Sequence, residues 1–288
     1  MERNIQIPGR CRIRPAEWQD AIPIQKLLNA HALVHRYLDW RHPIQWLGSQ
    51  PFLILEEEGK LQAVMACPVE RPGTAWIRLF ACNWEVSLES AWKVLFKEAS
   101  IQLTKTSEQI NCYILALEDW LDNLMQKQSY PMYQEIIILQ RRLDECSLHE
   151  KPPDIVIRPM TPADIPIIAE IDLSCFEDHW TYSIQTLEMA FQQSCFALVA
   201  DVNGGPIGYL LGTQAAETCH LARIAVHPGY KRRHIATHLI TRLFIDVRKK
   251  GIKYITLNTQ SNNKPSQALY DKMGFRRTGE SFGVYQLL

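Results

Sequence analysis

Three consecutive cations, Lys231, Arg232 and Arg233, separate an apolar stretch from an amphipathic one in the second half of the chain. The apolar stretch ends at Val226, a proline and a glycine follow, and the amphipathic stretch begins near Ile235. The amides of a helix's first turn have no partner within the helix, and together with the helix dipole they attract phosphate. Three cations beside such a turn suit a diphosphate ligand with further negative charge. A basic turn exposed to solvent would have the same sequence.

A second segment, NKPSQALYDKMGF, runs from Asn263 to Phe275. A proline in its first turn and Gly274 after its last turn predict a helix over 265–273. The two segments together resemble the two motifs of the GNAT acetyltransferase superfamily, VxPxY(Q/R)xxGx(G/A) and NxxAxxLYxKxGF. The resemblance covers residues 155–288, and within it this part of the chain is most similar to the ribosomal-protein alanine N-acetyltransferase branch.

The resemblance implies acetyl-CoA as co-substrate and direct acetyl transfer to a primary amine. Two parallel strands, 219–226 and 253–258, would splay apart, with the pantetheine arm in the gap and the pyrophosphate on the loop that follows. Tyr270 would protonate the leaving thiolate, for which a phenol with a pKa of about 10 is a suitable proton source. The cofactor-binding residues that the resemblance implies are Ile224, Ala225, Val226, Lys231, Arg232, Arg233, His234, Ile235, Ala236, Thr237 and Asn263.

The sequence departs from the superfamily pattern at two positions. His234 replaces a glycine of the phosphate loop, where an imidazole could crowd the phosphate or donate to it. Asn258 stands where the N-terminal acetyltransferase branch has a glutamate, and asparagine cannot take a proton from an amine. His220 falls where other members have a glutamate on the strand before the loop, and its ordinary pKa of about 6.5 suits a base. A strand histidine that faces solvent, with deprotonation through water, is the alternative.

The hydrophobic pattern of the second half predicts a mixed α/β layer fold. Asn203, Gly204 and Gly205 between two apolar runs are a strong hairpin signal. We expect strands over 155–158, 196–202, 207–212, 219–226 and 253–258, helices from 161, over 181–192, 234–248 and 265–273, and a short closing hairpin from 275.

The first half resembles the second more faintly. Ile13-Arg14-Pro15 is followed by Asp20, and Ile157-Arg158-Pro159 is followed at the same offset by Asp164. A repeat this long indicates a duplicated domain, so we predict two tandem domains, 1–150 and 151–288, joined by the proline-containing segment 146–154. Each would be a twisted mixed sheet flanked by helices.

The first copy lacks the features that carry the chemistry. Its expected central strand, 75–82, is followed by Asn83-Trp84-Glu85-Val86-Ser87, which has no cation and no glycine, so that a phosphate would meet a carboxylate. Met125 occupies the position that corresponds to Tyr270. We therefore expect a degenerate GNAT-like copy without acetyl transfer.

Composition excludes several classes of protein. The chain has 288 residues, 47% hydrophobic and 22% charged, with 31 basic and 31 acidic side chains, which excludes a disordered chain, a collagen and a disulfide miniprotein. No apolar run approaches the roughly 18 residues of a membrane helix. Eight scattered cysteines favour free thiols in a reducing compartment. We expect a soluble, cytoplasmic protein without a membrane partner.

Residues 219–288 hold 13 basic and 3 acidic side chains, an excess of ten that indicates an anionic ligand. Nucleic acid is disfavoured as a partner, because apolar helix positions interrupt the basic residues. No metal is expected, since the pair His234 and His238 has no evident third ligand. The leading hypothesis is an N-acetyltransferase that acts on a peptide or small-molecule amine, and the alternative is a non-catalytic module that binds or senses acyl-CoA.

Overall fold

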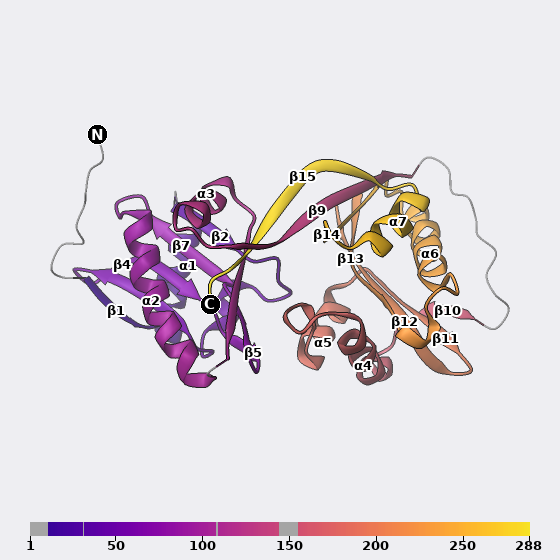
Figure 1. The fold of residues 1–288 in the computed structure, drawn as a ribbon, viewed down its shortest axis with the longest axis horizontal. Helices are drawn as coiled ribbons and strands as arrows, with labels where there is room; N and C mark the ends of the chain where they lie inside the picture. The colour runs from indigo at the N-terminus through magenta and orange to yellow at the C-terminus, as the bar shows by residue number, and fades with distance from the viewer. Residues whose placement is uncertain (1–10, 31, 108, 144–154) are drawn as a thin grey trace. The chain divides into compact units, whose positions relative to one another are not determined.

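The computed structural model describes residues 11–30, 32–107, 109–143 and 155–288, which form two compact units (Figure 1). Unit 1 comprises residues 1–134 together with 282–288, and unit 2 comprises residues 135–281. The segment 146–154, where the sequence predicts the domain boundary, lies outside the described residues.

Unit 2 is a mixed sheet covered by helices on both faces. Its strands follow the order β10-β11-β12-β13-β14-β9, and every neighbouring pair is antiparallel except β13 and β14, which are parallel. The strands are β10 (Val156–Pro159), β11 (Phe196–Val202), β12 (Gly205–Ala215), β13 (Thr218–Val226), β14 (Tyr254–Gln260) and β9 (Met132–Arg142). The helices are α4 (Ile165–Cys175), α5 (Ile184–Gln193), α6 (Ile235–Lys249) and α7 (Lys264–Lys272).

Side-chain alternation along β12 assigns the two faces of this sheet. Leu210 is buried in one core cluster with α6, whereas the hydroxyl of the adjacent Tyr209 donates to Asp172 of α4. The helices α6 and α4 therefore cover opposite faces. The hairpin expected between β11 and β12 is present, since Asn203 and Gly204 have φ of +52° and +82° at its turn.

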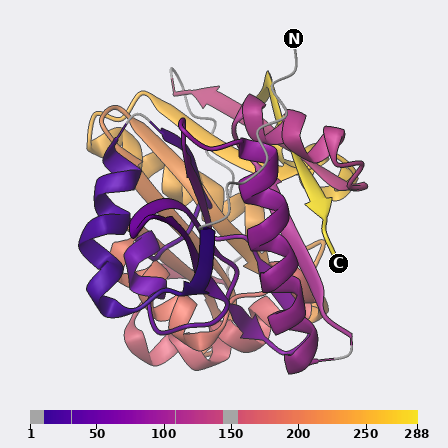
Figure 2. The ribbon, with the colours of Figure 1, turned by 90° about the vertical axis from the view of Figure 1, so that its left-hand side faces the viewer.

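Unit 1 repeats this layering around a five-stranded sheet of order β1-β3-β4-β7-β2. The strands β5, β6, β8 and the end of β15 form a second group. Helices α1 and α2 lie on opposite faces of the five-stranded sheet (Figure 2), because neighbouring residues of β3 such as Leu53 and Ile54 enter separate core clusters. The elements are β1 (Cys11–Pro15), α1 (Ala21–Asn29), β2 (Ala32–Arg36), β3 (Phe52–Glu57), β4 (Lys60–Ala66), β5 (Val69–Arg71), β6 (Thr74–Trp76), β7 (Leu79–Asn83), α2 (Leu88–Thr106), β8 (Asn111–Ala116), α3 (Asp119–Lys127) and β15 (Arg276–Gln286).

The duplicated motif builds the same ion-pair cluster in both units. The Arg14 guanidinium donates to both carboxylate oxygens of Asp20, at 2.7 and 2.8 Å, and to Glu56 of the neighbouring strand. Arg158 likewise donates to Asp164, at 2.8 and 2.7 Å, and to Asp201. Arg158 lowers the pKa of Asp164 to about 2. The repeat that the sequence indicates is thus a repeat of structure.

Each unit is completed by a strand from the other half of the sequence. In unit 2, β9 pairs along β14 from Arg142–Tyr254 to Ile136–Gln260. In unit 1, the end of β15 pairs with β8 from Gly283–Ala116 to Gln286–Tyr113. The short closing hairpin expected from residue 275 is wrong, because this segment is one long strand.

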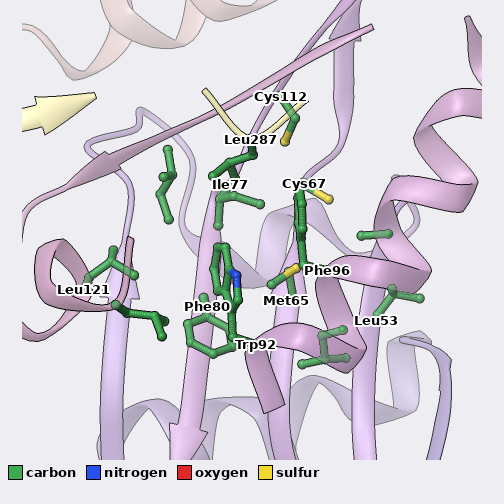
Figure 3. Close-up of a cluster of buried hydrophobic side chains, with 14 of the residues drawn as sticks. Leu53, Met65, Cys67, Ile77, Phe80, Trp92, Phe96, Cys112, Leu121 and Leu287 are labelled. Carbon is green, nitrogen blue, oxygen red and sulfur yellow. The ribbon is translucent and has the colours of Figure 1, made fainter. Parts of the chain in front are cut away.

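The C-terminal residues belong to the core of unit 1. Leu287 packs in a buried cluster with Cys67, Cys112 and Ile77 (Figure 3), and its N–H donates to the Cys112 carbonyl at 2.7 Å. Deeper in the same cluster the Trp92 ring meets Phe80 edge-on, with centroids 5.1 Å apart. The last residues of the chain therefore stabilise the first half of the chain.

Candidate functional site

The parallel strands β13 and β14 separate at one end. Their pairs run from Thr218–Tyr254 to Leu221–Leu257, and the described residues beyond this point, up to Val226 and Gln260, form no further pairs with each other. A bulge bends β13 at this point, since Leu211 and Gly212 of β12 face Arg223 and Leu221, which leaves Ala222 as the extra residue. The opening expected between these strands is present. Ile224, Ala225 and Val226 form the β13 side of it, paired only with β12.

The loop after β13 presents cations and backbone amides at the open end. Lys231, Arg232 and Arg233 are exposed, and α6 begins at Ile235. The first bond within the helix runs from the His238 N–H to the His234 carbonyl at 3.0 Å, so the N–H groups of residues 235–237 (Ile235, Ala236 and Thr237) have no helical acceptor. This is the geometry that anions bind.

His234 adopts the left-handed conformation, with φ of +60°. A residue with a Cβ pays a steric cost there that glycine avoids. We expect His234→Gly to raise the free energy of unfolding by up to about 1 kcal/mol, measured by chemical denaturation. His234→Ala is the control, because it removes the imidazole but keeps the Cβ. Equal free energies of unfolding for His234→Gly and His234→Ala would mean that the left-handed conformation at this position does not strain the backbone.

The start of α7 lies at the same edge of the sheet, because β13 and β14 are parallel and each is followed by its helix. Asn263 caps α7: its Oδ1 accepts from the Ser266 N–H at 3.2 Å, and its Nδ2 donates to Gln260 at 3.4 Å. The structure thus brings Asn263 and the basic loop, which are distant in sequence, to one edge.

Tyr270, on α7, is 5% exposed, and its ring lies 5.9 Å from that of Phe275. Burial raises the pKa of Tyr270 to about 12. Among the described residues its hydroxyl has no hydrogen-bond partner. The phenol is therefore protonated across the physiological pH range and has a proton that no neighbour engages.

His220 lies on β13 opposite Thr256 of β14, and its Nδ1 is 3.0 Å from the Thr256 Oγ1. Burial lowers the pKa of His220 below its ordinary value. The imidazole is consequently neutral at neutral pH. When Nδ1 donates to Thr256, Nε2 has the lone pair that can accept a proton.

His220 and Tyr270 belong to opposite faces of the sheet. Ile255 and Leu257 of β14 are buried in one cluster with Tyr270, so Thr256 and its partner His220 point to the other face, as does Asn258. A group that lies in the opening is accessible from both faces. The two candidate proton carriers could thus act on it from opposite sides.

Arg223 is a buried residue of this site that the sequence analysis missed. Its guanidinium lies 3.6 Å from the Phe176 ring and 3.8 Å from the Tyr182 ring, and donates two bonds of 2.8 Å to Asp172. It also donates to the carbonyl of Trp180 at 2.7 Å. These contacts fix the segment between α4 and α5 onto β13, next to the opening. A lone arginine within the apolar strand TCHLARIAV was the available signal, because buried arginines are paired.

The corresponding edge in unit 1 is covered by the chain itself. The predicted strand 75–82 is broken into two strands, β6 and β7. β6 pairs in parallel with β8. β7 pairs along its whole length with β2, from Arg36–Leu79 to Ala32–Asn83. The buried His35 of β2 approaches Glu118, the residue before α3, with its Nδ1 at 2.9 Å. Glu118 corresponds to Asn263 of unit 2, so β2 takes the place that is open there.

Comparison with known proteins agrees with the geometry of unit 2. Residues 165–275 match the acetyltransferase (GNAT) family. The chain is 37% identical over 78 residues to the spore coat polysaccharide biosynthesis protein SpsD of Bacillus subtilis, a match that covers 27% of this chain and only 27% of the length of that relative. It is 25% identical over 123 residues to a putative ribosomal protein bS18-alanine N-acetyltransferase of the same organism, covering 43% of this chain and 82% of the relative.

Structural similarity extends over both units. A tandem GNAT protein from the clavulanic acid biosynthesis pathway aligns with a TM-score of 0.61 at 10% identity, covering 96% of this chain and 98% of the other. At this identity the likeness shows the fold, and it confirms the predicted architecture of two tandem GNAT-like folds of the mixed α/β class. Among the described residues, no helix combines the length and apolar character needed to span a membrane.

Proposed function

Because residues 165–275 form a GNAT acetyltransferase domain, we propose that the protein transfers the acetyl group of acetyl-CoA directly to a primary amine, with the chemistry in unit 2. The observation that carries the proposal is the opening between β13 and β14, with a basic loop at its edge. A thioester in this opening would meet the backbone of residues 224–226 (Ile224, Ala225 and Val226), along which alternate residues direct their N–H and C=O groups away from β12.

The loop that follows β13 would bind the acetyl donor, acetyl-CoA. The amides of residues 232–237 and the exposed side chains of Lys231, Arg232 and Arg233 would hold the pyrophosphate. His234 is part of this loop, and Asn263 would contact the pantetheine. The cations position the donor, so proximity accounts for a large part of the rate enhancement.

The chemistry needs one proton donor and one proton acceptor. The neutral amine attacks the thioester carbonyl carbon, the C–S bond breaks, and Tyr270 protonates the leaving thiolate. His220 would take the proton that the amine nitrogen loses as the C–N bond forms, through Nε2. Unit 1 would bind no acetyl-CoA, since β2 covers the corresponding edge and the segment 83–87 has no cation.

The acceptor would be a peptide or a small molecule that bears an amine. The two relatives support both sources, since one is named for polysaccharide biosynthesis and the other for an alanine of a ribosomal protein.

Calorimetric titration with acetyl-CoA tests the proposal. We expect one site per chain, and an affinity at least about 30-fold weaker in a Lys231/Arg232/Arg233 triple alanine variant, because charge-assisted bonds to the phosphates are lost. A triple alanine variant of Arg248, Lys249 and Lys250, which are also exposed but lie at the far end of α6, is the matched control for net charge. No binding by the wild type would contradict the proposal. Binding without transfer to any amine would favour the non-catalytic acyl-CoA module.

A further inference from the structure

We propose that Arg223 is a positioning residue of the acetyl transfer: it holds the segment 176–182 against β13 and thereby sets the place at which the acceptor amine binds. This inference rests on the acetyl-transfer function proposed above. Arg223 is buried, so it acts through the segment between α4 and α5 and not by contact with the amine.

Arg223 lies on the same face of the sheet as His220, the candidate base. Side chains alternate along a strand, so residues three apart normally face opposite ways. The extra residue Ala222 at the bulge brings both side chains to one face. Their partners on β12, Leu211 and Thr213, are two residues apart and therefore share that face. Arg223 thus belongs to the side of the opening on which an amine would lose its proton.

The chain after α4 is attached to both ends of the part of β13 that borders the opening. Arg223, which precedes residues 224–226, donates to the Trp180 carbonyl at 2.7 Å. At the other end the thiol of Cys175, the last residue of α4, donates to the Val226 carbonyl at 3.2 Å. The end of α4 and the segment that follows it therefore border the opening on this face.

The acceptor would reach the thioester from this face. The base must reach the amine nitrogen, whereas the acid must reach the leaving sulfur. His220 points to the face of α4, and Tyr270 is buried in the cluster on the face of α6. The amine would consequently enter beside the segment 176–182, and the place of that segment would decide where the amine binds.

The guanidinium of Arg223 holds the segment by a geometry that needs a planar group. The rings of Phe176 and Tyr182 stack 3.6 and 3.8 Å from it. Its Nε and one terminal nitrogen donate to the two carboxylate oxygens of Asp172, at 2.8 Å each, and Asp172 also accepts from the Tyr182 N–H at 2.8 Å. A lysine ammonium offers neither the two parallel bonds nor the flat surface. The position of the segment therefore depends on arginine and not on positive charge alone.

Stability by itself does not explain a buried ion pair at this place. Asp172 is fully buried and Arg223 is 8% exposed. Removing two charges from water costs free energy, and replacing such a pair by apolar side chains is often neutral or stabilising. What the pair supplies is a fixed arrangement of β13, the end of α4 and the segment after it.

The test is steady-state kinetics of Arg223→Lys, with separate KM values for the amine and for acetyl-CoA. The amine is whichever of three acceptors the wild type acetylates: a lysine-free peptide with a free N-terminal alanine, glucosamine, or a peptide with a blocked N-terminus and one lysine. We expect the KM for the amine to rise by about tenfold or more and the KM for acetyl-CoA to stay within about twofold. A merely structural role would lower the amount of folded enzyme, and hence kcat, and leave both KM values unchanged.

Two further variants complete the test. Arg158→Lys is the matched control, because Arg158 makes the same two-bond pair with Asp164 at the other end of α4, and both KM values should be unchanged. Asp172→Asn/Arg223→Met is used in case Arg223→Lys does not fold. It leaves no unpaired buried charge, and the new amide can still accept from the Tyr182 N–H. This double variant should fold and still show the raised KM for the amine.

An unchanged KM for the amine in the folded Arg223 variants, or an equal rise in Arg158→Lys, would overturn the inference and leave the proposed function intact. A KM for acetyl-CoA that rises by the same factor would do so as well, since the segment would then position the donor. Loss of folding in the double variant, measured by circular dichroism, would also overturn the inference, because the pair would be a requirement of the fold. Transfer by the wild type to none of the three acceptors, with acetyl-CoA bound, would overturn the proposed function itself.

Discussion

Replacing Tyr270 by Phe is expected to lower kcat by about 100-fold, with acetyl-CoA affinity and folding stability nearly unchanged. The substitution removes only the hydroxyl, whose role is to protonate the thiolate. Since this hydroxyl has no partner among the described residues, its loss breaks no hydrogen bond of the fold. Because the pKa of Tyr270 is raised to about 12, the wild type should lose no activity through this group as the pH rises to 10. Steady-state kinetics measures kcat, and calorimetry measures the affinity for acetyl-CoA and the folding stability.

Tyr209→Phe is the matched control for this substitution. It is the same chemical change in another buried tyrosine, but the Tyr209 hydroxyl donates to the buried Asp172. Its loss should lower the free energy of unfolding by about 1–3 kcal/mol. An unchanged kcat in Tyr270→Phe would remove this residue from the role of acid. A loss of stability equal to that of Tyr209→Phe would indicate a structural role.

Removing β9 from unit 2 is expected to prevent stable folding. A fragment of residues 151–281 exposes the edge of β14 and the apolar surface against which Ile136, Ile137 and Leu139 are buried. Burial of three such side chains is worth about 5 kcal/mol or more, which is comparable to the whole stability of a small domain. The Arg141 guanidinium, which stacks 4.4 Å from the Phe244 ring and donates to the Met273 carbonyl, is lost as well.

A fragment of residues 131–281 is the comparison, because it keeps β9 and covers unit 2 as the structure defines it. Circular dichroism during thermal unfolding should show a cooperative transition for 131–281 and none for 151–281. Equal transitions would mean that β9 adds nothing to the stability of unit 2. Hydrogen exchange along β14 would then show whether its edge is protected in the shorter fragment.

The sequence was sufficient for the features that depend on residues close together in the chain. The turn at Asn203 and Gly204, the helix after the three cations and the repeated arginine–aspartate motif were all predicted. Each follows from local chemistry: turn residues with positive φ, helix periodicity, and two charges six residues apart. The GNAT-like fold followed from two local motifs in the right order.

Other features depend on which distant segments meet, and only the tertiary structure decided them. The exchange of β9 and β15 was missed because either strand could have paired within its own half, and alternation of hydrophobic residues does not name a partner strand. The same holds for β2, which covers the edge of β7 in unit 1.

Burial decided the state of the candidate catalytic residues. An ordinary histidine and tyrosine were expected at 220 and 270, but the surrounding core lowers one pKa and raises the other. Arg223 was missed because its partners Asp172 and Tyr182 are 51 and 41 positions away in sequence. The sequence by itself determined which side chains the protein has for its chemistry; the packing of distant segments determined their protonation, their partners and the face of the sheet on which each one lies.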